Sequence, residues 1–132
     1  MRDRLALFAA ALWWGSLTAI GFMAVPLLFR HLPTPAMAGQ MAARLFTAQA
    51  WVSVACGVLL LLCLRDSAKS QVDKAQTAIM FVLAGLLLAL LVEFGVAPRI
   101  VARENLALWH SVGTAMYALQ WLCAALVLWR IR

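Results

Sequence analysis

Residues 75–98 read AQTAIMFVLAGLLLALLVEFGVAP, and Glu93 is the single charged side chain among them. A helix rises about 1.5 Å per residue, so a helix of this length crosses the roughly 30 Å hydrocarbon core of a bilayer. Three further runs have the same apolar character and a comparable length, namely residues 5–29, 45–64 and 106–129. The sequence therefore predicts four transmembrane helices.

The composition of the chain fits a protein that lies in lipid. Of the 132 residues, 66% are hydrophobic and 12% are charged, whereas charged residues make up roughly a quarter of a soluble domain. Nothing alternates apolar and polar residues with a period of two, which disfavours a membrane β-barrel. Because the connections are short, sequential helices should lie antiparallel. We predict an all-α, polytopic membrane protein, a single domain over residues 1–132 that forms an up-down-up-down four-helix bundle.

The beginnings of the first two helices follow from local signals. Residues 5–29 form a longer apolar stretch than the roughly 7–15 residues of a signal-peptide core, and no A-x-A cleavage site follows them. We therefore expect this helix to be retained. The second helix is expected to begin before its apolar run, because Thr34 can cap a helix whose first residue is Pro35.

The basic residues indicate how the chain is oriented in its membrane. The net charge is +6, but Lys and Arg gather at the ends of the apolar runs, so a nucleic-acid partner is not expected. One end of the bundle carries Arg2, Arg4, Arg65, Lys69, Lys74, Arg130 and Arg132. The other end carries a basic rim of Arg30, Arg44, Arg99 and Arg103. Since basic residues favour the cytoplasmic side, we predict a protein of the cell (inner or plasma) membrane with both termini in the cytoplasm. The rim is expected to anchor helix ends in the headgroups; capture of an anionic solute is the alternative.

A faint internal repeat links the two halves of the chain. The first run leaves the membrane through Ala24-Val25-Pro26 and the third through Val96-Ala97-Pro98. The second and fourth runs open with Trp51-Val52-Ser53 and Trp109-His110-Ser111. Two helical hairpins in parallel arrangement would be related by a pseudo-two-fold axis along the membrane normal.

Glu93 stands out among the polar residues inside the apolar runs. It follows Gly85 and Ala89 and precedes Ala97 at intervals of four residues, which places all of them on one face of a regular helix. Small residues on such a face let neighbouring helices approach closely. Because exposing a carboxylate to lipid costs several kcal/mol, we expect Glu93 to face protein and to be a functional residue.

A polar cluster is predicted around Glu93. On the fourth helix, His110, Tyr117 and Gln120 share a face, and Gln49 lies on the second helix. Glu93 and His110 should both lie about 6–8 Å below the same membrane boundary. We predict that these two residues pair and that the cluster forms a relay or a ligand site in the outer leaflet. The alternative is that its members only cross-link helices, which membrane bundles often require.

The sequence carries no pattern that predicts an enzyme. The three cysteines, Cys56, Cys63 and Cys123, fall inside apolar runs without CxxC or Cys/His spacing, so we expect them to pack as small hydrophobic residues. No serine elbow, phosphate loop, HExxH or paired-carboxylate pattern is present. We therefore expect a protein that is not a hydrolase and has no catalytic residues.

The chain resembles the transmembrane-protein-205-like family of small four-helix membrane proteins over most of its length. The resemblance is carried by Pro26-Leu-Leu-Phe29, His31-Leu-Pro33, Ala38-Gly39, Leu45-Phe46, Glu93-Phe-Gly-Val-Ala-Pro98-Arg99-Ile100 and His110-Ser-Val-Gly-Thr-Ala-Met-Tyr117. It implies the fold and the membrane, since that family has no established biochemical activity. Gly113 and Thr114 depart from the serine-containing pattern expected at their positions.

A weaker similarity, through the Pro-x-x-Phe exit of the first helix and a histidine near a helix start, links the chain to copper-resistance D and membrane protoporphyrinogen-oxidase families. The similarity implies haem or copper handling. Haem between helices usually takes two axial donors, and His110 is the one histidine inside an apolar run. The other candidates are Met80, Met116 and the peripheral His31. We therefore predict no cofactor, and the identity of any metal ligand stays open.

Three functions follow from these observations. The first is passage or sensing of a solute or ion through the outer-leaflet polar cluster. The second is haem or copper handling, and the third is a purely structural membrane subunit. The expected partners are the lipid bilayer, a small-molecule ligand of unknown identity and, for a complete passage, further copies of the chain in a homo-oligomer.

Overall fold

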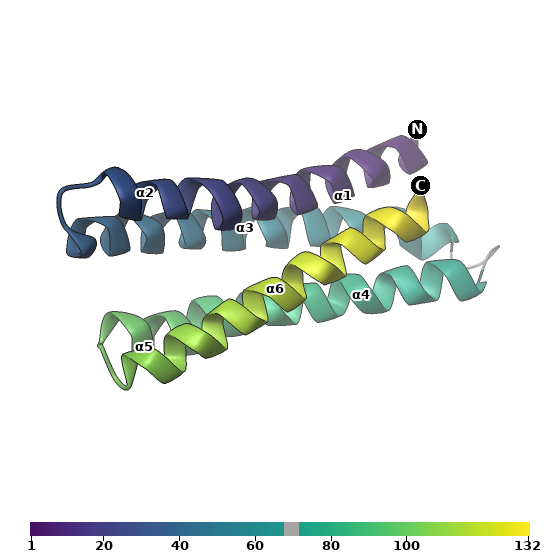
Figure 1. Cartoon of the computed structure of the whole chain (residues 1–132). Coiled ribbons are helices and arrows are strands. Elements are labelled where there is room, and N and C mark those ends of the chain that lie inside the picture. The colour runs from purple at the N-terminus through teal and green to yellow at the C-terminus, as the bar shows by residue number, and fades with distance from the viewer. Residues whose placement is uncertain (68–71) are drawn as a thin grey trace.

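Four long helical rods make up the protein in the computed structural model, which describes residues 1–67 and 72–132 (Figure 1). The first rod consists of α1 (Arg2–Ala19), η1 (Ile20–Ala24) and α2 (Val25–His31), and the second is α3 (Pro35–Ser67). The third consists of α4 (Val72–Leu91), η2 (Val92–Val96) and α5 (Ala97–Val101), and the fourth is α6 (Leu106–Ile131). The described residues contain no strand, and the predicted all-α four-helix architecture is confirmed.

Each rod is long and apolar enough to cross a membrane. The spans are Arg2–His31, Pro35–Asp66, Val72–Val101 and Leu106–Ile131. Large apolar side chains point outward on every rod, among them Phe8, Met80, Phe94 and Trp129. Outward apolar side chains suit lipid and not water. The chain is thus a multi-pass membrane protein.

The rods pack as two hairpins side by side. In Figure 1, α1 and α2 lie along α3, while α6 crosses over α4. The two chain termini lie at one end of the bundle, and α5 and the α2–α3 connection lie at the other. This is the up-down-up-down order expected from short connections. The sequence also predicts a middle loop over residues 65–74; its ends are helical, since α3 runs to Ser67 and α4 begins at Val72, and residues 68–71 lie outside the described part of the chain.

Local chemistry fixes where α3 begins. The backbone N–H of Met37 donates a hydrogen bond to Thr34 Oγ1 at 3.2 Å, and Pro35 is the first residue of the helix. Pro suits that position because its missing N–H would have had no helical partner. The predicted cap is confirmed, and the helix begins ten residues before its apolar run at residue 45.

A small-to-large contact lies at the centre of the core. Trp13 is fully buried on α1, and its ring packs against the backbone of Gly85 on α4. A Cβ at position 85 would lie 2.5 Å from Trp13 Cη2, so any larger residue would overlap the ring. Cys56 and Cys63 are buried in the same core and Cys123 is half-buried, each as a free thiol.

Two π-turns interrupt the first and third rods. The N–H of Val25 donates to Ile20 O, and the N–H of Ala97 donates to Val92 O, so both bonds span five residues. Pro26 or Pro98 follows directly. A proline inside a helix lacks an N–H, and its ring clashes with the carbonyl four residues earlier. The wider turn accommodates this defect, and such turns often lie at functional sites.

The π-turns reveal the register of the internal repeat. The turns η1 and η2 lie 72 residues apart, as do Pro26 and Pro98, and the starts of α3 and α6 are 71 apart. This spacing aligns Gln49 with Gln120, and both are buried. The predicted alignment of Trp51 with Trp109 spans 58 residues and is wrong. Trp51 is exposed on α3 and does not mark the repeat.

Candidate functional site

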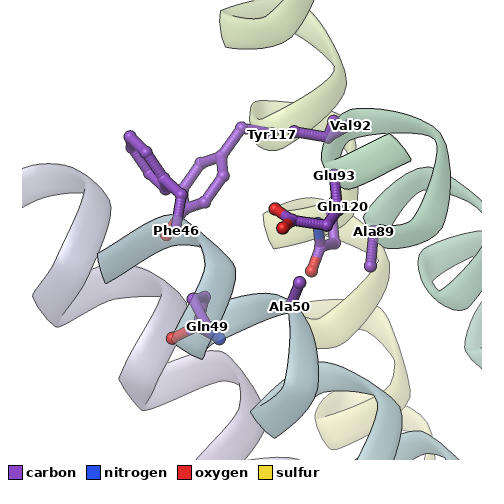
Figure 2. Close-up of a pocket in the computed structure, with 8 residues that line it drawn as sticks. All are labelled: Phe46, Gln49, Ala50, Ala89, Val92, Glu93, Tyr117 and Gln120. Atoms are coloured by element: carbon purple, nitrogen blue, oxygen red, sulfur yellow. The ribbon is translucent and has the colours of Figure 1, made fainter. Parts of the chain in front are cut away.

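Glu93 lies on η2 beside a small pocket between α3, α4 and α6 (Figure 2). The hydroxyl of Thr47 on α3 donates a hydrogen bond to Glu93 Oε1 at 2.8 Å. Glu93 is half-buried and Thr47 is exposed, so this contact lies at the rim of the bundle. The pocket is lined by Phe46, Gln49, Ala50, Ala89, Val92, Glu93, Tyr117 and Gln120. It therefore brings together four of the five residues predicted for the polar cluster.

The pocket is small. Its free volume is about 10 Å³, which is close to the smallest space that holds one water molecule. Two aromatic rings, Phe46 and Tyr117, form one wall, with their centroids 5.3 Å apart and their planes at 71°. Ala50 and Ala89 leave the opposite side open because their side chains are short.

A hydrogen-bonded network forms the polar floor of the pocket. Gln49 Nε2 donates to Ser16 Oγ at 3.0 Å and to Ser53 Oγ at 3.4 Å. Ser53 Oγ in turn donates to Gln120 Oε1 at 2.8 Å. The network joins α1, α3 and α6, and its members Gln49, Ser53 and Gln120 are at most 4% exposed. Because such burial is costly for an unpaired polar group, these bonds stabilise the packing of three helices.

The direction of these bonds decides what the pocket presents to Glu93. The amide oxygen of Gln120 already accepts from Ser53. Gln120 and Glu93 both line the pocket (Figure 2). An amide nitrogen carries two N–H donors and no acceptor. The floor of the pocket therefore offers hydrogen-bond donors to a carboxylate or to a water oxygen.

Glu93 has no cationic partner in the described part of the chain. The ion pairs found there join Asp66 to Arg2 and to Arg65, the second at 3.6 Å. Both lie at the terminal end of the bundle, away from η2. A carboxylate within an apolar span is costly unless it is paired or faces a polar cavity. Glu93 meets this requirement through Thr47 and the pocket.

Tyr117 serves as a wall of the pocket, and its hydroxyl is directed elsewhere. The hydroxyl donates to the backbone carbonyl of Leu17 on α1 at 2.6 Å. The ring lies so close to Gly21 of η1 that a Cβ there would overlap it. Tyr117 thus joins α6 to the first π-turn while its ring borders the pocket beside the second.

The predicted pair between Glu93 and His110 is not formed. His110 is exposed on α6, and no ion pair within residues 1–67 and 72–132 includes it. The prediction assumed regular α-helical spacing through Glu93. Instead η2 begins at Val92, and the wider turn presents Glu93 to Thr47 on α3. The buried face also shifts, since Val96 is buried and Ala97 is only half-buried.

The basic rim lies at the α2–α5 end of the bundle, as predicted, and its side chains are exposed. Arg99 on α5 stacks over the ring of Trp109 with 4.4 Å between Cζ and the ring centroid. Pro26 and Pro98 each stand second in the short helices α2 and α5 that lead to this end. The rim and the pocket are separate features.

Two site residues escaped the sequence-based prediction. Thr47 contacts Glu93, and Ser16 anchors the polar network on α1. Neither belongs to the predicted polar cluster, and hydroxyl residues are common where membrane helices pack together, so their spacing carried no signal. For metal binding, no three His, Cys, Asp or Glu side chains gather in the described residues.

Comparison with known proteins assigns the chain to a family. No curated protein and no solved structure matches the chain. The match that is found supports a family of unknown function and does not support the transmembrane-protein-205-like designation. The chain belongs to the family defined by a domain of unknown function, DUF4149, which matches residues 8–108.

Proposed function

We propose that this membrane protein binds a small ion or polar solute in the Glu93 pocket, for passage or for sensing. The observation that carries the proposal is an acidic side chain, Glu93, that has no cationic partner within residues 1–67 and 72–132 and lies at the edge of a polar-floored pocket inside an apolar span. An ionisable residue within a membrane usually marks an ion path, a relay or a ligand site.

A purely structural role explains the polar floor but not Glu93. Ser16, Gln49, Ser53 and Gln120 satisfy one another and cross-link three helices. Among the described residues, Glu93 adds a single bond to the exposed Thr47, and an uncharged glutamine would accept the same bond. Retaining a charge there has an energetic cost that the packing of the bundle does not require.

The pocket size bears on the choice between passage and sensing. A volume of about 10 Å³ accommodates one water-sized group, which suits a binding site within one chain. Passage would require a longer path, and we propose that copies of the chain would have to supply it as a homo-oligomer. Sensing requires only that occupancy changes the packing of η2.

We also propose that the protein lies in the cell (inner or plasma) membrane with both termini in the cytoplasm. The end that carries the termini holds more Lys and Arg than the basic rim does, and such a bias sets orientation. The Glu93 pocket would then open near the outer leaflet. Reporter fusions at residue 132 and in the connection at residues 32–34 test this orientation.

The experiment compares three forms of the protein in lipid nanodiscs: wild type, Glu93→Gln and Glu104→Gln. Glu104 is the matched control because it is an exposed carboxylate in the α5–α6 connection. Thermal unfolding is recorded over a panel of pH values, alkali and divalent chlorides and small polar solutes. We expect at least one condition to shift the midpoint of wild type and Glu104→Gln but not of Glu93→Gln. A bound ligand at 100 times its Kd stabilises by about 2.7 kcal/mol.

Equal responses of all three forms would overturn the proposal. Absorption spectroscopy and metal analysis of the same samples address haem or copper handling. A Soret band or stoichiometric copper would replace the proposed function with that alternative.

A further inference from the structure

We propose that the species bound at Glu93 is a proton, held together with one water molecule, and not a metal cation. The inference rests on the proposed function and names its ligand. Three features carry it: the volume of the pocket, the hydrogen-bonding groups that line it, and the charged residues around it.

The volume admits one water-sized species. A space of about 10 Å³ excludes a hydrated ion, and a water placed there needs two to four polar partners. The Glu93 carboxylate and the Gln120 amide both border this space. A single water molecule is therefore the occupant that fits.

The lining offers too few oxygen ligands for a metal cation. Calcium takes six to eight oxygen ligands and magnesium a near-ideal octahedron. Here Tyr117 directs its hydroxyl to Leu17 O, and the amide oxygen of Gln120 accepts from Ser53. A proton requires none of these ligands.

The hydrogen bonds at Glu93 leave one carboxylate oxygen for the proton. Thr47 donates to Oε1, so the proton bonds to Oε2. In this step a hydronium ion delivered through the pocket gives its proton to Oε2 and becomes the pocket water. The product is a neutral carboxyl group whose O–H donates to that water, and no oxidant or co-reactant is needed.

The charged and titratable groups on the elements packed around η2 leave Glu93 as the site of the proton. Arg44 on α3 and Arg99 on α5 both have exposed side chains. Arg99 stacks on the ring of Trp109. From α6 come His110, which is exposed, and Tyr117. The charged residues of α4, Asp73 and Lys74, lie at its opposite end. None of these groups forms an ion pair with Glu93 among the described residues.

The chain offers a selective spectroscopic label. Glu93 and Glu104 are its two glutamates, so carboxyl-¹³C-glutamate in a Glu104→Gln background labels Glu93 alone. The protein in nanodiscs is studied by infrared difference spectroscopy between neutral and acidic pH. We expect a labelled C=O stretching band to appear on acidification, to shift in D₂O, and to keep its midpoint when NaCl, KCl or CaCl₂ is exchanged. This readout does not depend on the folding of a Glu93 variant.

The outcomes separate the two proposals. A midpoint that moves with the metal ion, or a labelled band that never titrates while the protein stays folded, would overturn proton binding. If a salt or solute still stabilised wild type but not Glu93→Gln, the proposed function would stand with a different ligand. If neither a band nor any ligand response depended on Glu93, both proposals would fail.

Discussion

The two π-turns have the same backbone geometry but opposite surroundings. Around η1, Tyr117 covers Gly21, and Trp121 packs against Trp14 and Phe22 with ring centroids 5.9 and 5.6 Å apart. Around η2, the repeat spacing of 71–72 residues puts Ala50 where Trp121 stands and Glu93 where Gly21 stands. We call these regions the filled side and the open side.

The difference shows how two hairpins with the same backbone features can form a tightly packed helix interface in one place and a candidate site in the other. The backbone device is shared, since each turn precedes a proline. On the filled side the indole of Trp121 also donates to Thr18 Oγ1 at 2.8 Å. On the open side an alanine leaves space, and a carboxylate borders it. We therefore expect function on the open side, where Ala50 takes the place of a large side chain such as Trp121.

The largest effect is expected from opening the filled side with Trp121→Ala. The change removes two aromatic contacts and the hydrogen bond to Thr18. We expect a loss of about 3 kcal/mol in the free energy of unfolding, measured by reversible unfolding in mixed micelles. Trp51→Ala is the control, because Trp51 is 58% exposed, and its effect should stay near 0.5 kcal/mol. Equal losses of unfolding free energy for both variants would show that packing around Trp121 on the filled side does not stabilise the bundle.

The next effect distinguishes the glycines of the two turns. Gly21→Ala places a Cβ against the ring of Tyr117, and overpacking of this kind costs about 2 kcal/mol. Gly95→Ala in η2 meets nothing within 4 Å and should gain about 0.5 kcal/mol from helix propensity. The same unfolding assay applies. A destabilised Gly95→Ala beside a neutral Gly21→Ala would reverse the assignment of the two sides.

A smaller effect is expected at the floor that both sides share. Gln120→Leu removes the acceptor of the Ser53 hydroxyl, and the loss should be about 1 kcal/mol. Since the two residues are hydrogen-bonded, Ser53→Ala combined with Gln120→Leu should cost less than the sum of the single changes. Additive losses would mean that the bond contributes nothing to stability.

The smallest effect on stability is expected from filling the open side with Ala50→Leu. The three added carbons exceed the pocket's free volume of about 10 Å³ and extend past its open side, so the free energy of unfolding should fall by no more than about 1 kcal/mol, at the low end of overpacking costs. The carbonyl band of Glu93 should nevertheless lose its exchange in D₂O, because the pocket water is displaced. Ala48→Leu, at an exposed position of the same helix, is the control. An unchanged band in Ala50→Leu would show that the pocket is not the route to Glu93.

The sequence predicted the fold and part of the site for different physical reasons. Long apolar runs require helices in lipid, so the four spans were evident. Gln49 and Gln120 were predicted as members of the polar cluster, and both are buried at the floor of the pocket. The partner of Glu93 was missed because the face was assigned with α-helical spacing, and η2 departs from it at Val92.

The internal repeat, too, was predicted only in part from the sequence. Pro26 and Pro98 indicated the repeat, because a proline near the end of an apolar run is easily recognised in a sequence. The second and fourth helices hold no proline beyond Pro35 at the start of α3, so their register was assigned from a tryptophan match that the structure contradicts. The correspondence of Gln49 with Gln120 becomes visible only through the bounds of α3 and α6.

The contact of Trp13 with Gly85 has a consequence for how the two hairpins became different. These residues are 72 positions apart, the spacing that also separates the two π-turns, so they occupy corresponding positions in the two hairpins and contact each other. Identical residues would fail there, since two tryptophans would collide and two glycines would leave a hole. A large and a small partner solve this problem and give each hairpin a distinct identity. A difference between the hairpins at this contact is therefore a packing requirement, and it leaves the two π-turns free to serve different purposes.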